Sequence, residues 1–360
     1  MKTGRTSLWR ILAPLLAFAL IAGACGDDDD DDAGADDTTT TAGEEDSSDT
    51  TAGEETDSSD MEEGDGEEGM MEYSSISEID LSGIEIAVGS KDFTEQLVLG
   101  QLMVAAFEAT GADVTDRVNL GGTAVAREAL LSGDIDVYAE YNGTGWTNHL
   151  GQDDPSFDPD ELTQNVREMD LAENDIHWLG QAPFNNTYGF ATGSALTEEN
   201  GGAFDMQGMA DYLEANPDST VCMETEFPDR PDGLVLFEDH TGYTIPEDQI
   251  QILDTSVIYT ETADGNCDFG EIFTTDGRIP ALDLTIVEDP GVMILYNISM
   301  NVRDDLYQQA PAEFDAIAEM LLAPLDNETM ADLNAQRDVE GLTPEEVATN
   351  FLTEQGLIDG

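Results

Sequence analysis

Residues 84–96 of this 360-residue chain read IEIAVGSKDFTEQ, and this stretch sets the class of fold that we expect. Its first five residues suit a short apolar strand, and the loop Gly89 to Phe93 follows. Apolar residues then recur at helical spacing from Thr94 to Thr110. The stretch therefore predicts a strand, a loop and a helix in succession.

The same order of elements repeats further along the chain. We expect a strand over Val114–Leu120, a turn at Gly121-Gly122-Thr123, a helix over Ala124–Ser132 and a strand over Ile135–Tyr138. Strands that alternate with helices indicate a parallel, doubly wound sheet. Ligands of such sheets bind at the carboxyl ends of the strands, where residues 90–93, 121–123 and 141–144 are expected to lie.

A second group of elements follows Asn186. We expect strands over Tyr188–Thr192, Gln251–Leu253 and Asp283–Glu288, and a helix over Met206–Asn216. The chain returns near Tyr296, and helices are expected over Ala310–Leu322, Asn327–Val339 and Thr343–Leu357, the last with cap signals at Thr343, Pro344 and Glu345. The pattern predicts a second α/β lobe.

The first 25 residues predict export. Lys2, Arg5 and Arg10 precede an apolar run, Ile11 to Ala22, and small residues lead from it to Cys25. The run has about twelve residues, whereas crossing a bilayer needs roughly twenty. Cys25 stands where a signal resembling the bacterial lipobox carries its acylated cysteine, although an alanine replaces the more usual leucine three residues earlier, so plain secretion stays open.

Residues 26–75 predict an acidic, disordered tether. From residue 26 to about residue 72 the segment consists mostly of Asp, Glu, Gly, Ser and Thr with almost no large apolar side chain, so it cannot bury enough surface to offset its ordering entropy. Its like charges repel one another and extend it. A calcium site is the alternative, but the spacing of an EF-hand is missing.

The chain carries a formal net charge of −69, from 80 acidic and 11 basic residues. This charge argues against nucleic acid or an anionic membrane surface as a partner, and it suits a cationic ligand. An acidic surface adapted to salty surroundings explains most of these charges without any ligand. Net charge alone therefore does not identify a site.

Cys222 and Cys267 remain as a pair when Cys25 is set aside, and an exported protein permits their oxidation. We expect one disulfide. Two free buried thiols or half of a metal site are the alternatives, but a metal site needs more nearby Cys or His residues than this sequence offers.

Motifs of enzymes are absent from the sequence. It contains no Gly-x-Ser-x-Gly elbow and no His-Glu-x-x-His zinc helix, and His149, His177 and His240 have no ligand-like spacing. Ser90 and Lys91 are adjacent rather than at helical spacing. We therefore expect neither catalysis nor a cofactor or metal.

Five separated motifs carry a resemblance to a known family. They are GSKDFTEQ at 89–96, NLGGT at 119–123, DIDVYAEYNGT at 134–144, FPDRPDG at 227–233 and FTTDGRI at 273–279. In this order they resemble the glycine betaine, carnitine and choline binding proteins of osmoprotectant ABC importers, over nearly all of residues 84–358. Any one of them alone would be a weak signal.

The resemblance implies an α/β fold of the type II periplasmic-binding-protein kind, with two doubly wound lobes joined by a two-strand hinge. It places lobe I at residues 82–184 plus 293–360 and lobe II at 185–292. The implied partners are a small quaternary amine and the permease subunits of an ABC transporter. A monomer is expected, held at the outer face of the membrane by its lipid anchor only.

The resemblance also implies the site residues. The family's aromatic box falls on Tyr141, Tyr188, Phe273 and Tyr296, with Gln96 and Thr144 as polar neighbours and Arg230 as the partner of a ligand carboxylate. Phe269 is the alternative to Phe273, which stands where many relatives have tyrosine.

Quaternary amine chemistry agrees with these residues. A trimethylammonium group has no N–H to donate, so aromatic faces hold it, each for about 0.5 to 2 kcal/mol. The guanidinium of Arg230 offers a planar fork that suits a carboxylate. An amino acid or polyamine remains the alternative ligand for the same fold, and its site would need carboxylates around the ammonium groups.

Overall fold

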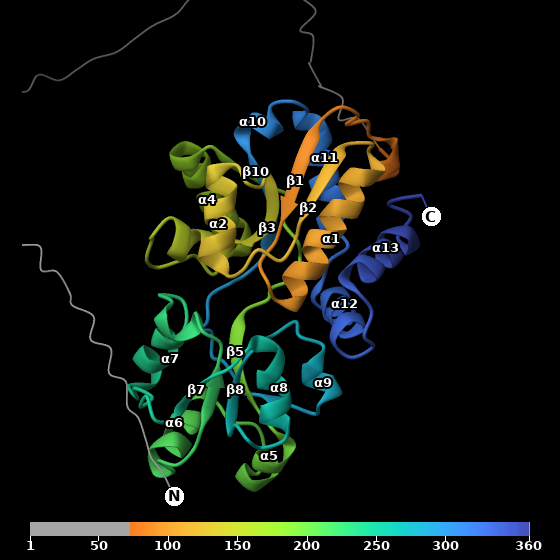
Figure 1. Cartoon of the computed structure of the whole chain (residues 1–360). Coiled ribbons are helices and arrows are strands. Elements are labelled where there is room, and N and C mark those ends of the chain that lie inside the picture. Colours follow the sequence, from red (N-terminus) through yellow and green to blue (C-terminus); the bar gives the residue numbers. More distant parts are fainter. Residues whose placement is uncertain (1–72, 360) are drawn as a thin grey trace, which may run out of the picture. The chain divides into compact units, whose positions relative to one another are not determined.

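The computed structural model describes residues 73–359. The expected signal, the acylated Cys25 and nearly all of the expected tether lie outside these residues. The described part contains two five-stranded sheets with helices packed on them (Figure 1). None of its helices is long and apolar enough to cross a membrane.

The first sheet has the strand order β2-β1-β3-β10-β4. Its strands are β1 (Glu85–Gly89), β2 (Asp113–Arg117), β3 (Val137–Tyr141), β4 (Ile176–Leu179) and β10 (Ile298–Arg303). β1 is parallel to β2 and β3, but β10 is antiparallel to β3 and β4. The three strands expected to be parallel are so, whereas β10 returns from the other lobe and enters this sheet in the opposite direction.

Helices cover both faces of the first sheet, and the alternation of side chains along its strands explains why. Val137 and Ala139 of β3 belong to one buried cluster and Tyr138 belongs to another. The helices on the first cluster are α1 (Thr94–Ala109), α11 (Pro311–Leu322), α12 (Asn327–Asp338) and α13 (Pro344–Glu354). The second cluster is covered by α2 (Thr123–Ser132) and α4 (Pro159–Asn174).

The second sheet has the order β7-β6-β8-β5-β9 and is also mixed, because β5 is antiparallel to β8 and β9. Its strands are β5 (Tyr188–Thr192), β6 (Val221–Met223), β7 (Ile250–Ile252), β8 (Phe269–Phe273) and β9 (Thr285–Ile286). Val221 and Met223 face the core under α6 (Met206–Ala215) and α7 (Leu234–Thr241), whereas Cys222 faces α8 (Thr255–Ala263).

Several shorter elements complete the chain. They are α3 (Asn142–Thr144), α5 (Ser194–Asn200), α9 (Arg278–Ala281) and α10 (Asp304–Tyr307), with the turns η1 (Ile76–Glu78), η2 (Gly145–His149) and η3 (Phe227–Asp229). At α13 the expected cap signals Thr343, Pro344 and Glu345 are present, and Thr343 forms a reciprocal capping box with Glu346.

Two segments connect the lobes, one between β4 and β5 and one between β9 and β10. They run side by side: the amide of Asn186 donates to the carbonyl of Tyr296 at 3.1 Å, and the amide of Tyr296 donates to Oδ1 of Asn185 at 2.7 Å. The expected two-lobed α/β fold, with two doubly wound lobes and two connections, is confirmed.

Candidate ligand-binding cleft

A cavity of about 480 Å³ lies between the two lobes. The first lobe contributes the carboxyl ends of β1 and β3 and the start of α2, and the second contributes the loops after β6 and β8. Residues of all three loops expected at the ligand edge line it, namely Lys91, Asp92, Phe93, Gly122, Thr123, Tyr141 and Thr144. The strand-end rule therefore located the cavity correctly.

Five aromatic rings meet at this cavity. Phe93 stacks on Phe273 with ring centroids 4.9 Å apart, and Phe273 lies 5.2 Å from Tyr188. Tyr188 meets Tyr296 at 5.3 Å, and Tyr141 lies 6.2 Å from Tyr296 and 6.3 Å from Phe93. All five line the cavity. The structure thus brings the four expected rings together and adds Phe93.

Sheet register explains the position of two of these rings. Tyr188 and Phe273 are directly opposite each other in the antiparallel pair of β5 and β8, so their side chains are neighbours on one face. Phe269, the alternative to Phe273, is fully buried and lies 5.1 Å from Phe204 in the core of the second lobe. Phe273, and not Phe269, reaches the cavity.

Two of the tyrosines are held by carboxylates. The hydroxyl of Tyr141 donates to Oε1 of Glu95 at 2.8 Å, and that of Tyr296 donates to Oδ2 of Asp232 at 2.7 Å. Burial raises the pKa of both phenols well above their usual value, and the neighbouring carboxylates raise it further. The two phenols therefore stay neutral and fixed, and Lys91 Nζ lies over the ring of Tyr141, 5.1 Å from its centroid.

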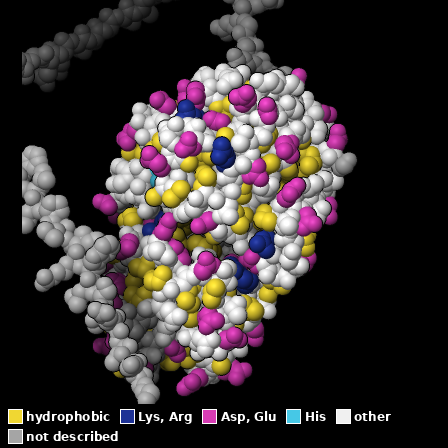
Figure 2. Space-filling model, in the orientation of Figure 1, with side chains coloured by type: hydrophobic (Ala, Val, Ile, Leu, Met, Phe, Trp, Pro, Cys, Tyr) yellow, Lys and Arg dark blue, Asp and Glu magenta, His cyan; other side chains and the backbone are white. Residues whose placement is uncertain are grey.

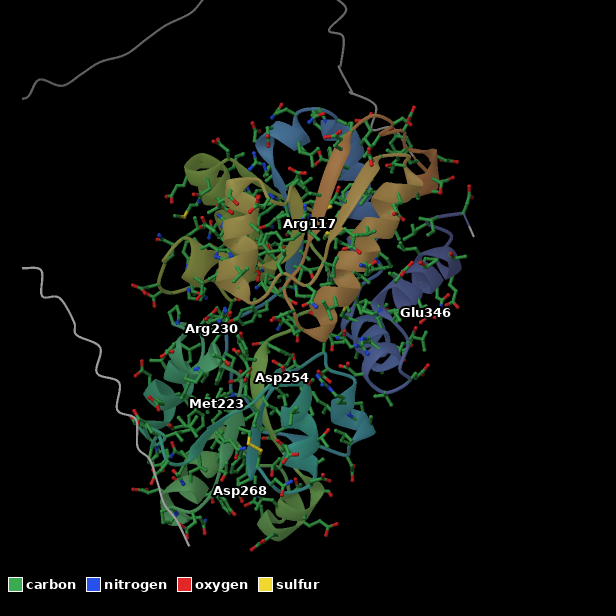
Figure 3. All side chains as sticks on the ribbon, viewed as in Figure 1. Arg117, Met223, Arg230, Asp254, Asp268 and Glu346 are labelled. Carbon is green, nitrogen blue, oxygen red and sulfur yellow. A yellow bond between two sulfur atoms is a disulfide. The ribbon has the colours of Figure 1, made fainter. Side chains whose placement is uncertain are left out.

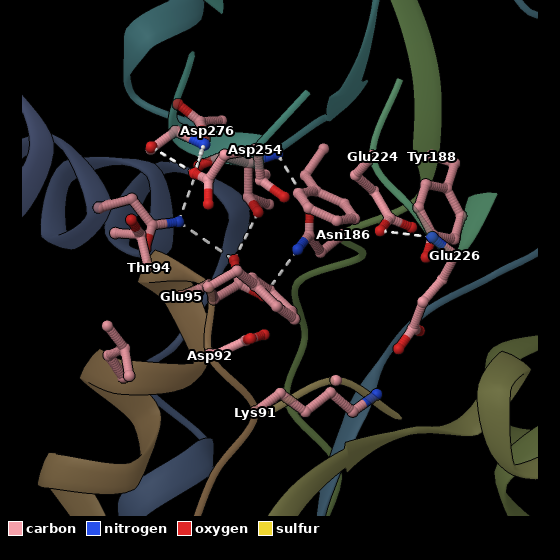
Figure 4. A pocket seen from close by; sticks show the side chains of 18 of the residues that line it. Lys91, Asp92, Thr94, Glu95, Asn186, Tyr188, Glu224, Glu226, Asp254 and Asp276 are labelled. Atoms are coloured by element: carbon pink, nitrogen blue, oxygen red, sulfur yellow. Dashed lines mark hydrogen bonds between the residues drawn. The ribbon is translucent and has the colours of Figure 1, made fainter. Parts of the chain in front are cut away.

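Glu95 is a buried junction of both lobes. Its carboxylate accepts hydrogen bonds from Tyr141, from Asn186 of the first connection, from Thr275 after β8 and from Asn334 of α12. Burial raises the pKa of Glu95, and these four donors oppose that rise. The junction ties the floor of the cavity to both sheets (Figure 4).

Arg230 is engaged inside the protein. Its Nε and Nη2 each donate to Asp232 at 2.8 Å, and Nη2 lies 3.2 Å from Oγ1 of Thr144. Its guanidinium lies 5.4 Å from the ring centroid of Tyr188. Thr144 lines the cavity, whereas Arg230 lies behind the lining. Figure 3 labels Arg230 at the edge of the second lobe. Its pairing with a ligand carboxylate stays a prediction.

Gln96 also stands behind the lining. It is fully buried, and its Oε1 accepts a hydrogen bond from the amide of Lys91 at 3.3 Å. Its Nε2 has no hydrogen-bond partner among residues 73–359. Gln96 therefore supports the loop after β1 and does not face the cavity.

Carboxylates dominate the charged part of the lining. Seven acidic side chains line the cavity: Asp92, Glu95, Glu224, Glu226, Asp254, Asp276 and Asp338. Three basic side chains accompany them: Lys91, Arg278 and Arg337. Acidic side chains are also scattered over the visible surface, where basic ones are few (Figure 2). The cleft thus has a field that attracts cations.

Two of the three basic side chains are paired within the protein. Lys91 Nζ lies 2.7 Å from Glu140, and Arg278 bonds Asp276 and lies 3.4 Å from Asp338. Across the described residues no group of three or more His, Cys, Asp or Glu side chains is placed to hold a metal ion.

The second lobe contains a disulfide between Cys222 and Cys267, whose Cα atoms are 5.8 Å apart. Figure 3 shows it as a yellow bond near β6 and β8. It packs under Ile258 of α8, away from the cavity lining. The disulfide belongs to the core of this lobe and not to the cleft.

Sequence reasoning missed Phe93 and the carboxylates. Phe93 belongs to a quoted motif and to a loop expected at the ligand edge, so its position was a usable signal. Glu226 precedes Arg230 by four residues and pairs with it, but its partner across the cleft, Thr123, is 103 residues away in the chain.

Comparisons with known proteins agree with this geometry. Residues 84–354 match the family described as the substrate-binding domain of the ABC-type glycine betaine transport system. A glycine-betaine-binding protein of Pseudomonas aeruginosa is 33% identical over 286 residues, which cover 76% of this chain and 89% of the relative. The glycine betaine-binding protein YehZ of Escherichia coli is 31% identical over 281 residues, covering 75% and 90%.

Solved structures give the same result. The apo form of YehZ from Escherichia coli superposes with a TM-score of 0.55 at 30% identity, covering 76% of this chain and 99% of that one. A structure described as a glycine betaine/carnitine/choline ABC transporter has a TM-score of 0.61 at 21% identity, with the same coverage, and supports the fold.

Proposed function

The chain belongs to the family of substrate-binding domains of ABC-type glycine betaine transport systems, and on this basis we propose that it captures a quaternary amine such as glycine betaine, choline or carnitine. Members of this family bind a substrate for a transporter and do not transform it, so the chain is a binding protein and not an enzyme. It works outside the cytoplasm with the permease subunits of an ABC importer.

The aromatic cluster at the cavity is the observation that carries this proposal. A trimethylammonium group offers no N–H donor, so a site recognises it through dispersion and through ring faces whose negative quadrupole attracts its charge. Five neighbouring rings line the cavity, and their phenols and phenyl groups carry no charge of their own. The surplus of carboxylates in the lining adds a long-range attraction for a cation.

We assign the rings of Tyr141, Tyr188, Phe273 and Tyr296 to the cage, with Phe93 as a fifth wall. Thr144 supplies a hydroxyl at its edge, and Gln96 and Arg230 support it from behind the lining. A ligand carboxylate would reach Arg230 only by competing with Asp232 at Nε and Nη2 or with Thr123 and Glu226 at Nη1.

The arrangement along the chain is part of the proposal. The signal and Cys25 would leave a lipid-anchored monomer at the outer face of the membrane, with residues 26–75 as its tether. Lobe I, at 82–184 plus 293–360, and lobe II, at 185–292, would close over the solute. The strand membership of the two sheets supports these lobe limits, and the sequence alone supports the anchor.

A ligand screen by thermal unfolding tests the proposed function. Glycine betaine and choline are compared with their unmethylated parents glycine and ethanolamine, and carnitine, spermidine and glutamate complete the screen. A bound ligand at about 100 times its Kd stabilises the fold by about 2.7 kcal/mol. The proposal expects a rise in Tm with methylated amines only. A rise with spermidine or amino acids alone would assign the cleft to those ligands instead.

A further inference from the structure

Glu226 bridges the cleft and occupies the N-terminus of a helix in the opposite lobe. It lies after β6 in the second lobe, and its Oε1 accepts a hydrogen bond from the amide of Thr123, the first residue of α2, at 2.9 Å. The N-cap of α2 is Gly122, which has no side chain to cap the helix. The carboxylate of Glu226 therefore serves as the anion that the free amides at a helix start attract.

Gly122 makes this approach sterically feasible. A Cβ atom at position 122 would lie 2.0 Å from Oε1 of Glu226, which is closer than any non-bonded contact allows. Both Gly122 and Glu226 line the cavity beside the aromatic rings. Figure 4 shows Glu226 beside Tyr188, extending into the same space.

Basic side chains around the rings are likewise paired with carboxylates of the protein itself. Nε and Nη2 of Arg230 hold Asp232, and its Nη1 lies 3.4 Å from Oε2 of Glu226. Lys91 holds Glu140, and Arg278 holds Asp276. Arg337 is the remaining basic side chain of the lining, and it forms no ion pair within residues 73–359. It is next to Asp338 in the sequence. Burial raises the pKa of Asp338, although the charges of Arg278 and Arg337 oppose this rise.

Several carboxylates of the cavity lining have no basic partner among the described residues. Asp92, Glu224 and Asp254 line the cavity and form no ion pair with any Lys, Arg or His of the described residues. The carboxylate of a zwitterionic ligand would be repelled by these groups and by Glu226. A ligand whose only charge is positive would not be repelled by them.

We propose that Glu226, an internal anion at the start of α2, makes the cleft selective for monocationic quaternary amines without a carboxylate, the chemical class of choline, over zwitterionic betaines. This inference rests on the proposed function and narrows its ligand class. A betaine carboxylate meets Glu226 as a like charge, or must displace it from the amide of Thr123 and from Arg230. The hydroxyl of a choline-like ligand meets neither obstacle, because it can donate to Glu226.

Choline and glycine betaine are matched probes, because they share the trimethylammonium group and differ in a hydroxyl against a carboxylate. Isothermal titration of the full chain is expected to give a Kd for choline at least about tenfold below that for glycine betaine, a difference of about 1.4 kcal/mol. Glu226→Gln keeps an oxygen for the amide of Thr123 and removes the charge. It is expected to reduce the choline preference to about threefold or less, chiefly by strengthening betaine binding.

The control is Glu173→Gln, an exposed carboxylate on α4 that does not line the cavity, and it should leave both Kd values unchanged. Tighter binding of glycine betaine by the unmodified chain, or an unchanged preference in Glu226→Gln, overturns the inference. If Arg230→Ala or Arg337→Ala then abolishes betaine binding alone, a guanidinium holds the ligand carboxylate.

Tetramethylammonium has neither a hydroxyl nor a carboxylate, so its binding reports on the aromatic cage alone. Binding of tetramethylammonium without a choline preference contradicts the role of Glu226 and leaves the proposed function standing. No binding of tetramethylammonium, choline, glycine betaine or carnitine removes the proposed function and this inference together.

Discussion

The ring of Tyr188 stands at 89° to the ring of Tyr296, with their centroids 5.3 Å apart. Tyr188 opens β5 in the second lobe, whereas Tyr296 lies on the segment that leads to β10 in the first. The two aromatic side chains form a corner where the two connections run side by side. A cation held in this corner would contact the start of β5 and the segment that leads to β10, so we expect binding to be linked to the relative position of the lobes.

Removal of the Tyr188 ring should weaken every quaternary amine. Tyr188→Ala is expected to cost choline and glycine betaine roughly 1 to 3 kcal/mol each, because the lost ring face attracts the group that they share. Tyr188→Phe keeps the face and should cost much less. Titration calorimetry of both ligands measures these losses, and an unchanged Kd in Tyr188→Ala would remove this ring from the cage.

Asp232 should give the fold an acid-sensitive component. Burial acts to raise the pKa of Asp232. The charge and hydrogen bonds of Arg230, together with hydrogen bonds from Tyr296 and Asn148, outweigh burial and lower this pKa below its usual value. A carboxyl group with a lowered folded pKa stabilises the fold above its unfolded pKa of about 3.9, and this stability is lost as the pH falls through the folded value.

We therefore expect the free energy of unfolding to fall as the pH drops below about 4, and Asp232→Asn to make this fall shallower. Denaturant titrations at a series of pH values measure both slopes. The exposed Asp211→Asn is the control, since Asp211 lies on α6 outside the cavity. Equal slopes for the original chain and Asp232→Asn would contradict the account of this pair.

The bond between Cys222 and Cys267 should stabilise the second lobe. It closes a loop with a sequence separation of 45 residues. Such a loop is worth on the order of 3 to 4 kcal/mol, largely through the unfolded chain. Alkylation with mass spectrometry of protein from an oxidising compartment should find both thiols blocked, and reduction should lower Tm. Two alkylated cysteines in unreduced protein would show that the bond does not form.

Acylation of Cys25 is expected from the sequence alone. Cys25 follows the small residues of the expected cleavage site, and it is the position that a lipoprotein signal would modify. A palmitate analogue should label the original chain, and Cys25→Ser should release the protein from membranes. Export without labelling would favour plain secretion.

Local patterns predicted most of the fold. The strand and helix from residue 85 to residue 109 follow from apolar spacing, as do the last three helices. The direction of β10 did not follow from its sequence, because a strand's neighbours are set by long-range pairing across the lobes. β8 has the short sequence FGEIF, which periodicity alone could not separate from a loop.

The site was predictable where it depends on strand ends and on motif residues, and not where it depends on contacts between lobes. Tyr141 and Phe273 follow from the first kind of information. The hydrogen bond from Thr123 to Glu226 depends on how two lobes face each other, and neither residue's neighbours in the sequence indicate it. The pairing of Arg230 with Asp232 could not be predicted from the sequence either, because an acidic residue two positions away need not fold back onto the guanidinium.

The most direct test of the aromatic cage compares choline with its neutral carbon isostere, in which a tert-butyl group replaces the trimethylammonium group. The two molecules have nearly the same shape, so isothermal titration of each isolates the contribution of the charge. Several ring faces at about 0.5 to 2 kcal/mol each predict that choline binds at least about tenfold more tightly. Equal affinities for the two compounds would contradict a cation-binding aromatic cage.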